Sequence, residues 1–173
     1  MLRILFFCLA VGTAHGQAPS SAAPRLSLSE ARDGIVAATN QWTRARLAHD
    51  TAAFHRALLP EFYAVMNPMN PQARLSRGEF LTAISTPSSG SRLSRFDSSI
   101  LTVRRTPTGF EAIVEEKLEF VVTGADGTVT RNHALWITRD GWRQEGGEWK
   151  LEYSEAVGMQ GWNAPARPPF TDW

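Results

Sequence analysis

The chain has 173 residues, of which 43% are hydrophobic and six are tryptophans, so it can build one substantial core but hardly two. Lys and Arg number 18 against 17 Asp and Glu, and the cations are scattered along the sequence. This composition predicts a single domain and, because it offers no basic patch, argues against a nucleic-acid partner.

The N-terminus has the pattern of a secretory signal peptide. Arg3 precedes an apolar run from Ile4 to Val11, and small residues follow, with cleavage predicted after Gly16. The run is too short to span a bilayer, and no later stretch is long and apolar enough to do so. We therefore expect residues 1–16 to be removed from an exported protein, periplasmic or secreted, with no integral membrane segment after cleavage.

Residues 17–26 are rich in Ala, Pro and Ser and are predicted to form a flexible lead-in. The domain is predicted to begin at residue 27, because Ser27 and Glu30 have capping-box spacing and apolar residues follow at helical period. Asp50 then predicts the start of a second, shorter helix over residues 51–59.

A short hairpin is predicted over residues 62–75, where two Asn-Pro pairs mark the turn. Ser76 and Glu79 repeat the capping-box spacing and predict a third helix over residues 77–85. The helical part of the chain ends there.

From Arg92 onward the hydrophobicity alternates with period two along four long segments separated by three glycine-containing turn signals. Helices followed by an antiparallel meander predict an α+β domain with the helices on one face of the sheet. The domain is predicted to end at residue 157, and residues 158–173 to run extended over the surface.

The element order, the Leu-Ala-His-Asp sequence between the first two helices, and the pairing of Asp140 and Trp142 with Trp149 and Leu151 resemble the nuclear transport factor 2-like superfamily over residues 28–157. That superfamily includes SnoaL-like cyclases, ketosteroid isomerase and many exported proteins of unknown function. The resemblance implies a cone in which a strongly curved, mainly antiparallel sheet wraps N-terminal helices, leaves an apolar pocket at its wide end and often joins a homodimer. Members range from enzymes to carriers, so the fold does not fix the function.

The last predicted strand places Trp149, Leu151, Tyr153 and Glu155 on one face, which we expect to point to the helices. Trp149 and Leu151 are interpreted as core. Tyr153 either reaches the pocket mouth or packs in the core with its hydroxyl bonded to backbone. Glu155 either reaches the mouth or is solvated where the strand ends.

The preceding strand places Trp136, Asp140 and Trp142 on one face and His133 on the other. Asp140 is either a turn residue before Gly141, which the strength of the Asp-Gly signal favours, or a carboxyl group in an apolar wall with a raised pKa. His133 is more often a packed or surface histidine than a catalytic one.

Glu116 lies at the centre of an otherwise apolar strand face, whose other members are Phe110, Ala112, Val114, Leu118, Phe120 and Val122. An ionised carboxylate buried without a partner is costly, so in the pocket Glu116 must be paired, protonated or hydrated. Alternatively, a β-bulge at Glu115 and Glu116 turns it outward. Both interpretations stay open.

No metal or cofactor is predicted. Cys8 leaves with the signal peptide, and His49, His55 and His133 lack the spacing of metal ligands. The resemblance to ketosteroid isomerase would imply a tyrosine on the first helix, whereas Trp42 occupies its middle here.

Two functions are compatible with these patterns. The first is an exported module that binds a small apolar or aromatic molecule, and its predicted pocket residues are Trp42, Tyr63, Trp136 and Tyr153. The second is a cofactor-free cyclase, isomerase or lyase that transfers protons, with Tyr153 as a hydrogen-bond partner. Its candidate catalytic residues are Glu116, Asp140, Glu155 and His133.

The sheet face turned away from the helices carries Ile113, Val121, Leu135 and Ile137 among charged residues. A lone domain usually exposes less apolar surface than this. The pattern predicts a homodimer joined through this face.

Overall fold

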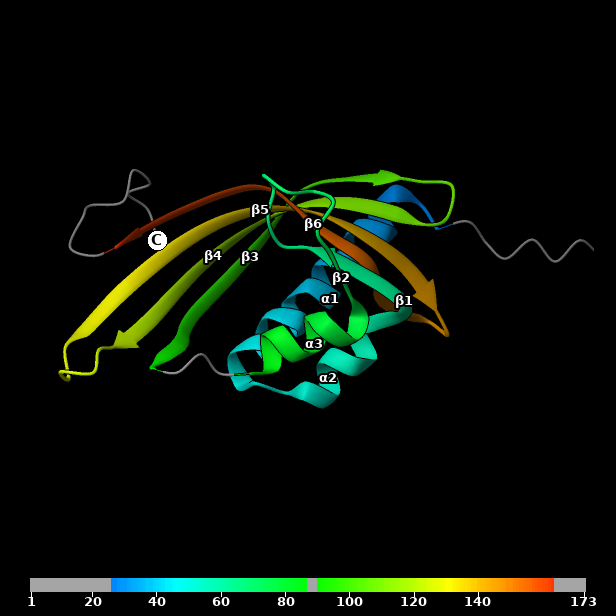
Figure 1. Cartoon of the computed structure of the whole chain (residues 1–173). Coiled ribbons are helices and arrows are strands. Elements are labelled where there is room, and N and C mark those ends of the chain that lie inside the picture. The colour runs from blue at the N-terminus through cyan, green and yellow to red at the C-terminus, as the bar shows by residue number, and fades with distance from the viewer. Residues whose placement is uncertain (1–25, 87–89, 164–173) are drawn as a thin grey trace, which may run out of the picture.

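The computed structural model describes residues 26–86 and 90–163, and in it three helices lie within the concave side of a curved six-stranded sheet (Figure 1). The predicted signal peptide, all but the last residue of the lead-in, and residues 164–173 of the predicted tail lie outside the described residues. The predicted α+β architecture is confirmed. Within the described ranges, no helix is long and apolar enough to cross a membrane.

The helices are α1 (Leu28–Ala48), α2 (Thr51–Ala57) and α3 (Arg77–Ser85). Both predicted capping boxes are present, because Ser27 and Glu30 exchange hydrogen bonds at the start of α1 and Ser76 and Glu79 do so at the start of α3. Helix α2 ends earlier than predicted, since Leu58 already belongs to a buried strand.

The strands are β1 (Leu58–Val65), β2 (Arg74–Ser76), β3 (Ser91–Arg105), β4 (Phe110–Thr123), β5 (Val129–Glu145) and β6 (Glu148–Asn163). Their order in the sheet is β2-β1-β6-β5-β4-β3. Strands β3 to β6 form the predicted antiparallel meander, and β1 with β2 forms the predicted hairpin. The parallel pairing of β1 with β6 was not predicted. Strand β6 also continues past the predicted domain end at residue 157, so residues 158–163 are strand.

One β-bulge in β6 decides which of its side chains face the helices. Leu151 and Tyr153 pair with Trp142 and Gly141, which are consecutive in β5, so Glu152 is an extra residue. The alternation of side chains therefore slips by one position at this point.

After the bulge, Ser154 and Ala156 line the same internal cavity as Leu151. Tyr153 and Glu155 instead lie on the outer face of the sheet. The prediction that they share the inner face with Leu151 is wrong for this reason.

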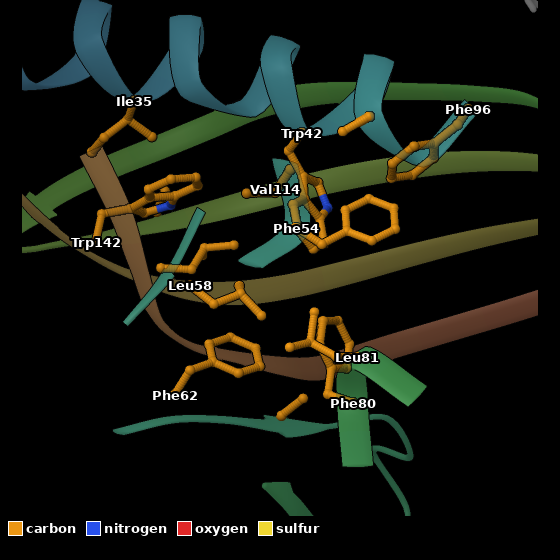
Figure 2. Close-up of a cluster of buried hydrophobic side chains, with 14 of the residues drawn as sticks. Ile35, Trp42, Phe54, Leu58, Phe62, Phe80, Leu81, Phe96, Val114 and Trp142 are labelled. Carbon is orange, nitrogen blue, oxygen red and sulfur yellow. The ribbon is translucent and has the colours of Figure 1, made fainter. Parts of the chain in front are cut away.

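The core between helices and sheet is strongly aromatic (Figure 2). Trp42 of α1 lies 5.2 Å from Phe54 and 6.2 Å from Phe80, measured between ring centroids. Leu151 is buried, as predicted. Trp149 packs on α1 but keeps part of its surface exposed.

Candidate functional site

A small cavity lies between α1, α3, the end of β1 and strands β4 to β6, and we call it the inner cavity. Its apolar lining residues are Trp42, Val65, Met66, Phe80, Trp136, Leu151 and Ala156. Its polar lining residues are Arg46, Glu116, Thr138, Asp140 and Ser154. The free volume of about 30 Å³ is enough for a single water molecule.

Glu116 points into this cavity. Each residue of β4 from Phe110 to Thr123 pairs with successive residues of β5, so the bulge considered at Glu115 and Glu116 is absent. Burial raises the pKa of Glu116 to about 7, and the negative charge of Asp140 acts in the same direction. Glu116 therefore gains or loses its proton near neutral pH, although the cavity around it is largely apolar.

Asp140 lies within β5 and is 6% exposed. The Asp-Gly turn favoured for this position is wrong, because the β5–β6 turn is made by Gly146 and Gly147, both with positive φ. The Ser154 hydroxyl donates a hydrogen bond of 2.7 Å to the Asp140 carboxyl group. Burial nevertheless raises the pKa of Asp140 to about 6.

Arg46 brings a cation to the same cavity. Its burial lowers the pKa of the guanidinium, while the charge of Glu116 opposes that shift. The guanidinium carbon also lies 5.3 Å from the centre of the Phe96 ring. Glu116, Asp140 and Arg46 thus form an electrostatically coupled group, in which burial raises the pKa of both carboxyl groups toward neutral pH.

The predicted site residues Tyr63, Tyr153 and Glu155 lie together on the outer face, not in the inner cavity. The two tyrosine rings stack with centroids 5.6 Å apart. Tyr63 donates a hydrogen bond of 2.8 Å to Glu155, and Tyr153 donates one of 2.9 Å to Glu111. Gly141 allows this arrangement, because a Cβ there would lie 2.3 Å from the Tyr153 ring.

The two carboxylates that bond these tyrosines, Glu111 and Glu155, each also pair with an arginine. Arg104 contacts Glu111 at 2.7 Å, and this bond lowers the pKa of Glu111. Burial acts to raise the pKa of Glu155, but hydrogen bonds from Arg139 and Tyr63 hold it below its ordinary value. These carboxylates are ionised and satisfied at neutral pH, which is typical of a structural network rather than of a reacting centre.

His133 lies on β5 directly across from Glu119. It stands three positions from Trp136, which lines the inner cavity, so its side chain is on the other face of the strand. The structure therefore does not bring His133 to Glu116.

Sequence reasoning missed Arg46 and Ser154 at the inner cavity. Arg46 follows Trp42 by one helical turn on α1, so helical spacing alone could have placed both on the buried side. The position of Ser154 depends on the bulge at Glu152, for which the sequence carries no comparable signal.

No protein-family model and no curated protein matches this sequence. Solved structures do match. A nuclear transport factor 2-like protein of unknown function in nutrient uptake from Rhodospirillum rubrum is similar with a TM-score of 0.53 and 19% identity, over 70% of this chain and 95% of that chain. The chain has the nuclear transport factor 2-like fold. The resemblance inferred from the sequence is thereby confirmed.

Two further solved structures are similar to this chain in fold. A protein from Kribbella flavida has a TM-score of 0.56 at 10% identity, over 78% of this chain and 95% of that chain. A candidate scytalone dehydratase from Novosphingobium aromaticivorans has a TM-score of 0.54 at 12% identity, over 75% of this chain and 85% of that chain. At these identities the likeness concerns the fold alone.

Within residues 26–86 and 90–163, no three or more His, Cys, Asp or Glu side chains are grouped to hold a metal ion. The inner-cavity residues themselves can supply the chemistry of carboxyl groups, hydroxyls and a guanidinium.

Proposed function

We propose that this protein is an exported domain that binds a small apolar or aromatic molecule with one polar group in the inner cavity. The observation that carries the proposal is the placement of Glu116, Asp140 and Arg46 behind an aromatic wall of Trp42 and Trp136. Apolar walls with a few convergent polar groups are the usual composition of small-molecule sites. The polar cluster would orient the ligand, and the wall would supply most of the contact area.

Ligand entry requires side chains at the cavity to move, because its free volume holds only a water molecule. Met66 and Trp136 are partly exposed apolar residues of the lining, so we expect them to shift when a ligand enters. Methionine is flexible and adapts to ligands of different shape. Export rests on the pattern of residues 1–16, and a mature N-terminus at Met1 after expression in a bacterium would contradict it.

A cofactor-free lyase or isomerase is the second candidate, and the two raised pKa values favour it. Between about pH 6 and pH 7, Asp140 is mainly ionised and Glu116 mainly neutral. In an elimination of water, the carboxylate of Asp140 would take a proton from carbon, and the neutral Glu116 would protonate the departing hydroxyl group. The fold is shared with a candidate scytalone dehydratase, which fits this reaction class.

Glu116→Gln tests both candidates, since it keeps the side-chain shape and removes the titration. We expect the wild type to bind 2-naphthol, a neutral aromatic probe, with an affinity that falls severalfold from pH 5 to pH 8, because ionised Glu116 must then be desolvated. In the variant the fall in affinity should be clearly smaller, because only Asp140 still titrates in the cavity, as measured by calorimetry. A wild-type affinity that does not change with pH would contradict a ligand site at Glu116.

The enzyme candidate requires a further result from the same two proteins. The wild type should speed the exchange of the α-protons of 2-tetralone in D₂O, as followed by NMR. Glu116→Gln should lose most of that effect, because neutral Glu116 would protonate the carbonyl oxygen while Asp140 takes the α-proton. Exchange at the buffer rate between pD 5 and 9 would exclude proton transfer at this site and leave the binding function.

The predicted homodimer remains a proposal. Ile113, Leu135 and Ile137 are partly exposed on the outer face, away from the helices. We expect light scattering to give about twice the monomer mass, and Ile137→Asp to give a monomer, because a buried unpaired charge is costly. Leu47→Asp, which changes an exposed leucine on α1, is the control and should stay dimeric.

A further inference from the structure

Trp42 also lines a second and larger cavity, which lies between α1, α2 and the β5–β6 hairpin. Its volume of about 350 Å³ falls in the usual range for small-molecule sites. We propose that this cavity, here called the tryptophan cleft, binds a small planar aromatic molecule that carries a neutral hydrogen-bond acceptor. The cleft is distinct from the inner cavity, with which it shares only Trp42.

The walls of the cleft suit a flat ring. Trp42, Trp142 and Trp149 contribute three indoles, and the facing helices contribute small side chains such as Ala38 and Ala53. Large aromatic surfaces opposite small residues leave a slot in which a ring can stack or pack edge to face.

Trp149 is held in place before any ligand arrives. A Cβ on Gly34 would lie 2.1 Å from its indole nitrogen, so only glycine lets the indole lie this close to α1. On the sheet side, its ring meets Phe110 in an edge contact with centroids 5.6 Å apart. A preformed wall loses little conformational entropy on binding.

The polar groups of the cleft indicate which polar group the ligand carries beside its aromatic ring. Trp142 is 2% exposed, and its indole N–H has no hydrogen-bond partner within the part of the chain that the structure describes. Buried donors are almost always paired. The nitrogen is itself inaccessible in the structure, so an acceptor on a bound molecule would satisfy it once the indole shifts toward the cleft. Arg56 and Glu148 are exposed lining residues of opposite charge, and their charges offset one another. A neutral carbonyl therefore fits better than a carboxylate or an ammonium group.

Calorimetry with 2-naphthamide at pH 7 tests this proposal. We expect the wild type to bind the amide more tightly than 2-naphthoate, whose charge would have to be desolvated near Glu148. Ala53→Leu should weaken binding by about tenfold or more, because the larger side chain occupies the slot. Ala52→Leu makes the same change at the preceding, exposed position of α2, which does not line the cleft, and should stay within about twofold of the wild type.

Two other variants keep the test decisive if Ala53→Leu fails to fold, which circular dichroism and thermal unfolding will show. Ala38→Leu narrows the cleft from α1 instead. Trp142→Phe keeps an aromatic wall but removes the donor, so it should weaken 2-naphthamide by about twofold to tenfold and leave 2-methylnaphthalene unchanged. No heat of binding at millimolar amide, or equal affinities for Ala52→Leu and the cleft-narrowing variants, would overturn the proposal.

Discussion

Glu116→Gln is expected to remove most of the decline in the free energy of unfolding that the wild type shows between about pH 4.5 and pH 7. The folded protein holds the carboxyl group at a pKa of about 7, against an ordinary value of 4.5. Between these values the folded state binds a proton that the unfolded chain has released. Rising pH therefore favours unfolding over this range.

The size of the effect follows from the pKa difference. One pKa unit corresponds to about 1.4 kcal/mol, so the wild type should lose about 3 kcal/mol through Glu116 across this pH range. Some exposure of the side chain makes this an upper value. At pH 8 the variant should therefore be the more stable protein, although both have similar stability near pH 4.5.

Urea denaturation of both proteins between pH 4.5 and pH 8 measures this difference. In the variant the free energy of unfolding should still decline below pH 6, by a smaller amount, because the pKa of Asp140 is raised from 3.8 to about 6. Glu115→Gln changes the neighbouring residue, whose side chain lies on the outer face, and serves as the matched control. Parallel curves for wild type and Glu116→Gln would show that the carboxyl group is not desolvated in the cavity.

The sequence narrowed the position of Glu116 to two interpretations, inward on the apolar face or outward at a bulge, and the structure shows the inward one. Regular alternation through β4 places it on the apolar face, and β4 contains no bulge against β5. The N-caps of α1 and α3, Ser27 and Ser76, were predictable for a related reason. A capping box needs only two residues three positions apart.

The outer-face residues could not be placed this way, because the bulge at Glu152 reverses the side chains that follow it, up to a second register shift at Val157. Tyr153 and Glu155 turn outward because Glu152 has no partner in β5, which is a property of the pairing between two strands. The Asp140 turn failed for a similar reason. The local Asp-Gly preference is overridden by the continuous pairing of Asp140 and Gly141 with β4, and Gly146 with Gly147 makes the turn.

Trp142→Ala is expected to lower the free energy of unfolding by about 3–5 kcal/mol, the usual cost of removing a large buried aromatic side chain. Trp142 is 2% exposed and packs in the core with Ile35 and Leu58 nearby (Figure 2). Because domains have a total stability of about 5–15 kcal/mol, this loss would approach complete unfolding if the domain lies at the lower end of that range.

Trp149→Ala provides the comparison, because it also removes one indole from the tryptophan cleft but starts from a partly exposed side chain. Folding removes less apolar surface from water at Trp149 than at Trp142. We therefore expect Trp149→Ala to lower the free energy of unfolding by about 1–3 kcal/mol. The sequence alone predicts full burial of Trp149, and hence the larger loss of unfolding free energy of about 3–5 kcal/mol. Urea denaturation at pH 5, where Glu116 is mainly protonated, compares the two variants without the effect of pH on that group. Equal losses would mean that Trp149 belongs to the core as fully as Trp142 does, and that the cleft beside it is closed in solution.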